Sequence, residues 1–342
     1  MFRLKTLSTT ALLLTTALGT PVPAQETAAA MPGEGTEIIL AQPTWDTGWF
    51  QTEIFRQLAI ELGYDVPEPI TLENAAFYQS VGMGDVTLWV DAWFPIHNTY
   101  MPAFEGSAEI IPDLVDGAAL EGYLVDKATA EAMDIDSIDD FKRDDVKAAF
   151  DRDGDGKADM VSCPPGWGCE LTIEHQMKAY GLNDHINLIK AGYPAAMADA
   201  VAAYSTGKPI LAYTWTPNWT VNDLVPGEDV VWIEVPEIAL PEHMADLVDA
   251  STRDGVVGCV NDPCKLGFPA NSIGAVANSA FLADNPPVRS LLEAFEIPIA
   301  DIYAQNAEFN AGNDDIAGQA SAWIEANRAD IDTWLDAARA AS

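Results

Sequence analysis

Apolar residues recur at strand spacing and at helix spacing in alternating stretches of this chain. Short apolar stretches typical of buried strands occupy residues 37–41, 86–90, 122–125, 209–215 and 230–235. Residues 50–62, 170–180 and 195–204 instead repeat apolar side chains every three to four positions, which is typical of helices. Strands separated by helices of this length predict an α/β fold with parallel sheets covered by helices.

The last part of the chain carries a helical pattern only. Its apolar side chains form one stripe, which consists of Ile316, Ala320, Trp323, Ile324, Ile331, Trp334 and Leu335. This stripe predicts that its two tryptophans pack against the rest of the fold and do not contact a ligand.

The first 24 residues have the pattern of a secretory signal peptide. Arg3 and Lys5 precede an uncharged stretch over residues 7–23, and Ala24 ends a short segment suited to cleavage. We therefore expect residues 1–24 to be removed on export. A retained membrane anchor is the alternative, but the apolar core is too short to span a bilayer. No later run reaches the roughly 20 apolar residues of a membrane-spanning helix.

Size and charge narrow the class of protein. About 318 residues follow the predicted cleavage site, which is more than one core usually supports, so two lobes are expected. The formal net charge of -36 excludes nucleic acid and anionic lipid as partners. This charge is compatible with a cationic ligand but does not identify one. The apolar fraction of 49% argues against disorder.

Four cysteines form two local pairs, Cys163 with Cys169 and Cys259 with Cys264. In an oxidising compartment such pairs predict two small disulfide loops. The alternative is a zinc site with four thiolate ligands, which favours two to four intervening residues within each pair. The second pair has four intervening residues and the first has five, so the spacing favours disulfides.

Four of the ten tryptophans lie at strand ends or in turns. Trp45, Trp93 and Trp215 follow or end a predicted strand, and Trp167 lies inside the first cysteine pair with a glycine on each side. Ligands of open α/β sheets collect at the carboxyl ends of strands, so these indoles can converge. Aromatic faces attract methylated ammonium groups, at about 0.5–2 kcal/mol for each contact. The four residues, here called the tryptophan cage, therefore predict a trimethylammonium ligand. For any one of them, ordinary core packing is the alternative.

A second group of residues is suited to an anion. Gly168 and Cys169 immediately precede the helix predicted from residue 170, and their N–H groups can point at a bound anion. His97 lies four residues beyond Trp93 and can donate a hydrogen bond to the same group. A histidine with a purely structural role is the alternative.

Residues 151–162 match the first part of an EF-hand calcium loop. Position 12 of the loop is Ser162 in place of the usual glutamate, so the last ligand must come from elsewhere. A solvated acidic turn is the alternative. We expect a structural calcium ion held by Asp151, Asp153, Asp155, Asp159 and the backbone carbonyl group of Lys157.

The sequence favours a binding protein over an enzyme. It has only four histidines, and it lacks the His-Glu-x-x-His, Gly-x-Ser-x-Gly and phosphate-loop motifs. A secreted hydrolase or lyase acting on methylated amines remains the alternative.

Several of these segments together resemble one family over nearly the whole chain after the predicted leader. The segments are Asp-Arg-Asp-Gly-Asp-Gly-Lys-Ala-Asp at 151–159, Cys-Pro-Pro-Gly-Trp-Gly-Cys-Glu at 163–170, Tyr-Thr-Trp-Thr-Pro at 213–217, Gly-Phe-Pro at 267–269 and Ala-Gln-Asn at 304–306. They resemble the periplasmic glycine betaine/proline betaine-binding proteins of ABC transporters. The loop at 163–169 is the most specific of these motifs.

The resemblance implies a two-lobed, type II-like periplasmic binding protein with its ligand cleft between the lobes. One lobe is expected from residues 33–125 with 262–342, and the other from residues 126–261. By the same resemblance, Trp93, Trp167 and Trp215 surround the ligand, while His97 and the N–H groups of Gly168 and Cys169 hold its carboxylate. The protein is then a periplasmic monomer that delivers its ligand to an ABC permease in the inner membrane. The sequence does not exclude a second partner, such as a chemoreceptor.

Trp45 departs from the enterobacterial betaine binders, in which a small or polar residue is expected. A fourth indole wall makes the cage smaller, as in the trimethylamine N-oxide-binding relatives from marine bacteria. We therefore expect trimethylamine N-oxide as the ligand, with glycine betaine or proline betaine as the alternative.

Overall fold

The computed structural model describes Met1 and residues 31–342, except for the side chains at positions 113 and 116–118. Residues 2–24 of the predicted signal peptide lie outside this part. Within it, no helix is long and apolar enough to cross a membrane.

One long strand joins the two halves of the main sheet. The strand order is β3-β11-β4-β7-β5-β6, and β8 also pairs with β4. In β4, residues 108–119 pair with β11, whereas residues 120–126 pair with β7 and β8. The strands are β3 (Leu88–Phe94), β4 (Ala108–Asp126), β5 (Ala158–Val161), β6 (Ile186–Ile189), β7 (Leu211–Thr216), β8 (Val230–Ile233) and β11 (Asn271–Asn278).

The sheet is mixed, so the prediction of parallel sheets is wrong for much of it. β5 runs parallel to β6 and β7, but β11 is antiparallel to both β3 and β4, and β7 and β8 are antiparallel to β4. Apolar spacing identifies strands but not their direction, and β11 forms only where the chain returns beside β3. Two small sheets add parallel β1 (Ala41–Pro43) with β2 (Ile70–Leu72), and antiparallel β9 (Thr252–Arg253) with β10 (Cys264–Lys265).

Three predicted helices agree with the structure to within two residues at each end. They are α1 (Trp49–Glu61), α5 (Gly168–Ala179) and α6 (Tyr193–Ser205). The other helices are α2 (Asn74–Met83), α3 (Lys127–Met133), α4 (Asp144–Phe150), α7 (Thr220–Asp223), α8 (Ser279–Asp284), α9 (Pro286–Ala294), α10 (Ile299–Asn310), α11 (Ile316–Ala326) and α12 (Arg328–Ala340). Short 3-10 turns are η1 (Asp46–Gly48), η2 (Ile96–Ala103), η3 (Ile138–Lys142), η4 (Glu242–Met244) and η5 (Asp249–Ser251).

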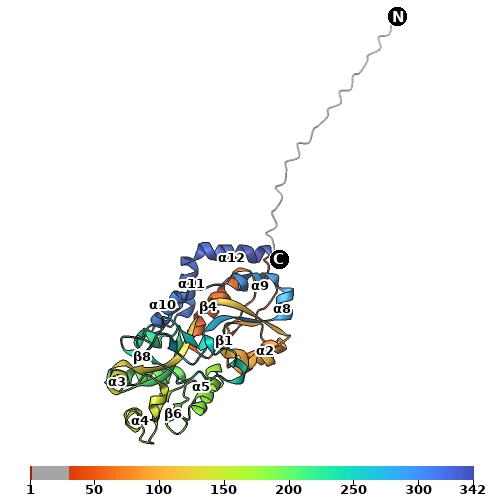
Figure 1. Ribbon diagram of the computed structural model, residues 1–342. Helices are drawn as coiled ribbons and strands as arrows, with labels where there is room; N and C mark the ends of the chain where they lie inside the picture. Colours follow the sequence, from red (N-terminus) through yellow and green to blue (C-terminus); the bar gives the residue numbers. More distant parts are fainter. Residues whose placement is uncertain (2–30) are drawn as a thin grey trace. The chain divides into compact units, whose positions relative to one another are not determined.

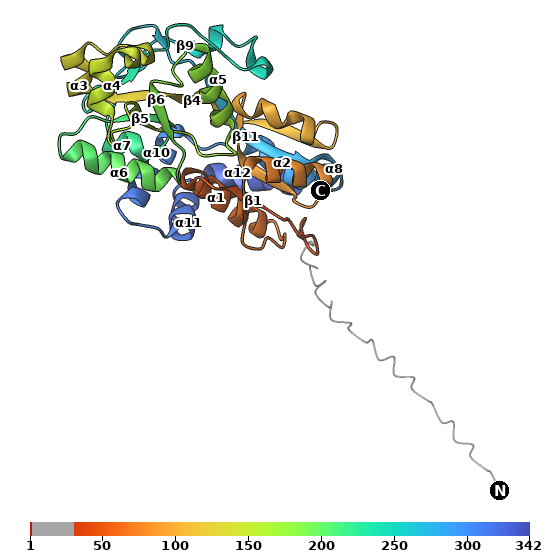
Figure 2. The ribbon, with the colours of Figure 1, turned by 90° about the horizontal axis from the view of Figure 1, so that it is seen from below.

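The helices gather at two ends of the main sheet, which gives the two-lobed α/β fold. Helices α1, α2 and α8 lie with β1, β3 and β11 at one end, while α3, α4 and α6 lie with β5, β6 and β8 at the other (Figures 1 and 2). β4 runs between the two ends. The lobe boundaries predicted at residues 125 and 262 stay a prediction.

The C-terminal stripe packs as predicted. Helix α11 lies on α1, and α12 lies on α9. The ring of Trp323 meets Phe50 at a centroid distance of 6.4 Å, and Trp334 meets Phe295 at 6.1 Å. These two tryptophans therefore hold the last helices on the fold, away from the cage.

Candidate ligand-binding site

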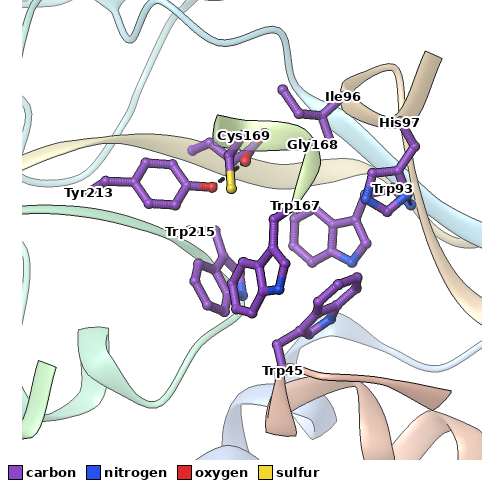
Figure 3. Close-up of a pocket in the computed structure, with 10 residues that line it drawn as sticks. Trp45, Trp93, Ile96, His97, Trp167, Gly168, Cys169, Tyr213 and Trp215 are labelled. Atoms are coloured by element: carbon purple, nitrogen blue, oxygen red, sulfur yellow. Dashed lines mark hydrogen bonds between the residues drawn. The ribbon is translucent and has the colours of Figure 1, made fainter. Parts of the chain in front are cut away.

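A cavity with about 320 Å³ of space, part of it open to solvent, lies where the ends of β3 and β7 meet the start of α5. Figure 3 shows the indoles of the tryptophan cage pointing toward the same space. The lining residues are Trp45, Trp93, Ile96, His97, Glu121, Trp167, Gly168, Cys169, Tyr213 and Trp215, which include all seven residues predicted to contact the ligand.

The four indoles come from four separate segments, and Trp167 meets both Trp45 and Trp215 edge to face. Trp45 lies between β1 and η1, Trp93 and Trp215 lie one residue before the ends of β3 and β7, and Trp167 caps α5. The ring centroids of Trp45 and Trp167 are 5.1 Å apart, and those of Trp167 and Trp215 are 5.6 Å apart. Each of the four side chains is at most 7% exposed. The cage can therefore shield a methylated cation from water on several sides.

The start of α5 supplies backbone donors at one wall. The N–H groups of Gly168 and Cys169 belong to the first turn of the helix, which has no intrahelical acceptors for them. Gly168 approaches η2 so closely that a Cβ atom there would lie 2.8 Å from the carbonyl oxygen of Ile96. Only glycine fits this approach, which places a helix N-terminus directly against the cavity. Such a terminus is suited to an anionic group.

His97 is buried and neutral. Burial lowers its pKa to about 3. The backbone N–H of Trp93 donates to its Nδ1 at 3.1 Å, and the Tyr78 hydroxyl lies 2.7 Å from the same atom, so the ring proton is on Nε2. Nε2 lies 2.8 Å from the amide nitrogen of Asn74, and the amide oxygen of Asn74 has no hydrogen-bond partner in the described part of the chain. Rotating that amide lets its oxygen accept the Nε2 proton. His97 is therefore held firmly, and its role toward a ligand stays a prediction.

Sequence reasoning missed a buried acid in the cavity wall. Glu121 is 3% exposed, and it accepts hydrogen bonds from the Tyr213 hydroxyl and from the Asn271 amide, the latter at 2.8 Å. Burial raises its pKa to about 7, although both hydrogen bonds act to lower it. Glu121 lies opposite Trp215 in the pairing of β4 with β7. Its place in the cavity thus depends on strand register, which the sequence does not display.

A second missed acid, Asp91, lies behind the cage and contacts two of its walls. Its Oδ2 accepts from the indole N–H of Trp45 at 2.5 Å, and its Oδ1 accepts from that of Trp93 at 3.3 Å. The side chain is 1% exposed. Its signal in the sequence is an aspartate inside an otherwise apolar strand.

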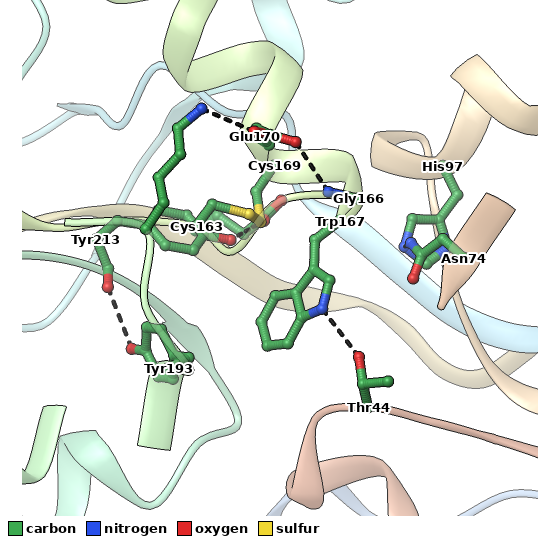
Figure 4. The surroundings of a disulfide bond; sticks show 12 residues. Thr44, Asn74, His97, Cys163, Gly166, Trp167, Cys169, Glu170, Tyr193 and Tyr213 are labelled. Atoms are coloured by element: carbon green, nitrogen blue, oxygen red, sulfur yellow. Dashed lines mark hydrogen bonds and ion pairs between the residues drawn. A yellow bond between two sulfur atoms is a disulfide. The ribbon is translucent and has the colours of Figure 1, made fainter. Parts of the chain in front are cut away.

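Both predicted disulfides are present, so the cysteines do not form a zinc site. The loop closed by Cys163 and Cys169 carries Trp167 and is tied to its surroundings on several sides (Figure 4). The Trp167 indole donates to the Thr44 hydroxyl at 3.0 Å, and the Tyr100 hydroxyl donates to the Gly166 carbonyl at 2.9 Å. The disulfide loop therefore presents its tryptophan rigidly, as the sequence indicated.

The acidic loop brings together three of its four predicted carboxylates. Oxygen atoms of Asp151, Asp153 and Asp159 all lie within 4.8 Å of one another. Asp155 is outside this group, and its carboxylate instead accepts from the backbone N–H of Lys157 at 2.9 Å. Oxygen ligands at this spacing suit a calcium ion. The loop lies next to β5, away from the cage.

Comparisons with known proteins agree with this geometry. Residues 36–326 match the model of the substrate-binding domain of ABC-type glycine betaine transport systems. The glycine betaine-binding periplasmic protein OusX of Dickeya dadantii is 38% identical, with 99% of this chain and 100% of the relative covered. The Escherichia coli glycine betaine/proline betaine-binding periplasmic protein is 37% identical, with 96% and 98% covered.

The comparisons also include more distant matches. The trimethylamine N-oxide-binding protein of Pelagibacter ubique is 21% identical, with 85% of this chain and 88% of the relative covered. In fold, the chain resembles lactococcal OpuAC complexed with glycine betaine, with a TM-score of 0.66, 21% identity, and 88% and 99% of the two chains covered. The prediction of a binding protein rather than an enzyme is thereby confirmed. This chain belongs to the family of substrate-binding domains of ABC-type glycine betaine transport systems.

Proposed function

We propose that this protein captures glycine betaine in the periplasm and delivers it to an ABC permease. The observation that carries this proposal is a cavity in which four indoles and a helix N-terminus line the same space. Glycine betaine has both groups that such a cavity suits, a trimethylammonium cation and a carboxylate. The curated relatives at 37–38% identity are named as glycine betaine-binding periplasmic proteins, which supports the same ligand and compartment.

The chemistry of each wall matches one end of this ligand. A quaternary nitrogen has no N–H to donate, so aromatic faces stabilise it without leaving buried acceptors unpaired. Three or four faces contribute several kcal/mol, and micromolar binding requires about 8 kcal/mol. The N–H groups of Gly168 and Cys169 supply charge-assisted hydrogen bonds to the carboxylate. The buried, neutral His97 adds no net charge that would repel the cation.

Binding and delivery follow from the two-lobed fold. We infer that residues 33–125 with 262–342 form one lobe and residues 126–261 the other. The lobes then close over the ligand by a hinge motion. The liganded protein, acting as a monomer, would dock on the permease.

Trimethylamine N-oxide is the second candidate. The family match and the relatives at 37–38% identity favour glycine betaine over the N-oxide that the sequence analysis preferred, because the N-oxide-binding relative is only 21% identical. Trp45 is the observation that favours trimethylamine N-oxide. Its ring packs edge to face on Trp167 in the cavity lining, and we expect it to reduce the space beside the methyl groups of the ligand.

Calorimetric titration of protein freed from bound ligand tests the proposal. Glycine betaine, trimethylamine N-oxide, choline and carnitine are titrated under identical conditions, and glycine betaine is expected to bind most tightly. Absence of heat with all four ligands would reject the cage as a binding site. Tighter binding of the N-oxide would reverse the choice of ligand but keep the class. A Trp167→Ala variant is expected to weaken every ligand, whereas Trp334→Ala, outside the cavity, is not.

A further inference from the structure

Two walls of the tryptophan cage are tied to a single buried carboxylate. Asp91 receives the indole N–H of Trp45 on one oxygen and that of Trp93 on the other, and the Gln51 amide lies 3.5 Å from the second oxygen. The protein makes room for this carboxylate at Gly48. A Cβ atom at that position would lie 2.2 Å from Asp91 Oδ2, so any larger residue would displace the acid.

Asp91 has no basic partner in the described part of the chain. Its pKa is raised to about 7 by burial, and the hydrogen bonds from Trp45 and Trp93 oppose this rise. Arg56, the nearest cation along α1, is paired with Glu53 and Glu68. Ionisable groups on the elements around Asp91 include Asp46 of η1, Glu53 and Arg56 of α1, Tyr78 of α2, His97 of η2 and Glu121 of β4, and none of them is hydrogen-bonded or ion-paired to Asp91 in the described part of the chain. An ionised Asp91 therefore lacks a counter-ion within the protein.

The ligand can supply this missing charge. Trp45 and Trp93 both line the cavity, and both donate to Asp91 from behind it. A cation held against these two rings is separated from the carboxylate by the width of an indole. In a buried site that is screened little by water, attraction over such a distance is substantial. A hydrogen bond from the indole N–H to an anion also makes the ring face more negative, which strengthens its contact with the cation.

We propose that Asp91 is a positioning residue that orients Trp45 and Trp93 and acts through them as the counter-ion of the quaternary ammonium group, so that ligand binding releases a proton from Asp91. This inference rests on the proposed function, because it requires a cationic group inside the cage. It predicts that affinity rises with pH. The cation favours the ionised form of Asp91, so protonated protein must lose a proton to bind, and the gain is complete once Asp91 is ionised in the free protein.

The size of the effect follows from the shift in protonation. If binding lowers the pKa of Asp91 by one unit, the affinity for glycine betaine increases about tenfold between acidic and alkaline pH. With a free-protein pKa of about 7, close to half a proton is released per ligand at neutral pH. A residue with only a structural role would change the affinity without releasing a proton.

Glycine betaine titrations in two buffers of different ionisation enthalpy measure this proton release directly. The wild-type protein is compared with Asp91→Asn and with Glu121→Gln, which neutralises the other buried acid at the cavity, and the matched control is Glu53→Gln, a buried acid on α1 outside the cavity lining. We expect wild type and Glu53→Gln to release the same fraction of a proton at pH 7, and Asp91→Asn to release markedly less and to lose most of its pH dependence. A third variant, Trp45→Phe, keeps an aromatic ring but removes one donor to Asp91. It is expected to move the pH midpoint of binding upward, which tests the inference even if Asp91→Asn does not fold.

The outcomes separate the two proposals. Binding that is equally strong at pH 5.5 and 8.5, with no dependence on the buffer, overturns the role of Asp91 but leaves the proposed function intact. Proton release that persists in Asp91→Asn and disappears in Glu121→Gln overturns it as well, because the titrating group is then Glu121. An unchanged midpoint in Trp45→Phe has the same meaning. Failure of the wild-type protein to bind glycine betaine at any pH rejects the proposed function instead.

Discussion

Replacing Trp45 with alanine tests which ligand the cage is shaped for. The substitution removes one aromatic face, which costs about 0.5–2 kcal/mol, or roughly a twofold to thirtyfold loss of affinity. Trimethylamine N-oxide is short and is held mainly through its methyl groups, so it should lose affinity at the upper end of this range. Glycine betaine keeps the contact of its carboxylate with Gly168 and Cys169, so its loss should be nearer the lower end.

The same substitution also affects the fold, and the experiment must separate the two effects. Trp45 is 5% exposed and packs edge to face on Trp89 at 5.5 Å and on Trp167 at 5.1 Å. Removing a buried indole costs about 3–5 kcal/mol of unfolding free energy. Trp323→Ala is the matched control, because it removes an indole packed on Phe50 outside the cavity.

Dissociation constants for both ligands are measured by calorimetry on each variant, together with its unfolding temperature. Trp323→Ala should lower the unfolding temperature and leave both constants unchanged. In Trp45→Ala the ratio of the two constants should shift in favour of glycine betaine. Equal losses for both ligands would refute the idea that Trp45 discriminates between them.

Three further predictions concern stability. Calcium added to chelated protein should raise its unfolding temperature, because ligands that bind only the folded state stabilise it. Asp151→Asn should reduce this gain. The proposed calcium site is rejected if scanning calorimetry shows the same unfolding temperature with and without the ion. Replacing Cys163 and Cys169 together by serine opens a loop with a sequence separation of 6. It should lower the free energy of unfolding, measured by chemical denaturation, by about 2 kcal/mol, and it should weaken ligand binding as well. Unaltered affinity would show that the loop need not be rigid. Burial raises the pKa of Glu121 to about 7. Its contribution to ligand-free stability is therefore present at low pH and is lost as pH rises through 7, by up to roughly 3 kcal/mol. Glu121→Gln should make the unfolding temperature depend less on pH between pH 5 and 8, and the same dependence on pH in both proteins contradicts this.

The helices and the cage could be predicted because their signals are local. The helix over residues 50–62 follows from apolar spacing alone, and Trp93 and Trp215 were identified because each ends a strand. Asp91 and Glu121 have no such signal. Asp91 is the single acid of an apolar strand, Glu121 is one of five acids in β4, and the meaning of each depends on which indole the fold places beside it.

The spacing of apolar residues also does not predict whether neighbouring strands run parallel or antiparallel. β11 lies between β3 and β4, which are earlier in the chain by more than a hundred residues. The apolar spacing within one segment does not show that the chain later returns to place β11 between two earlier strands. In the acidic loop at residues 151–162, the fold brings together Asp151, Asp153 and Asp159 but not Asp155, which bonds instead to the backbone of Lys157.

The two hydrogen bonds that tie the disulfide loop to Thr44 and Tyr100 bear on the rate of ligand release. Trp167 donates to Thr44 and Tyr100 donates to Gly166, and the walls between them are almost fully buried. Moving Trp167 out of the cage requires the loop to leave these two partners, so the rate of ligand release is expected to depend on how often both bonds open. A permease that pulls these two segments apart would release the ligand quickly, however tightly the cage binds it at equilibrium.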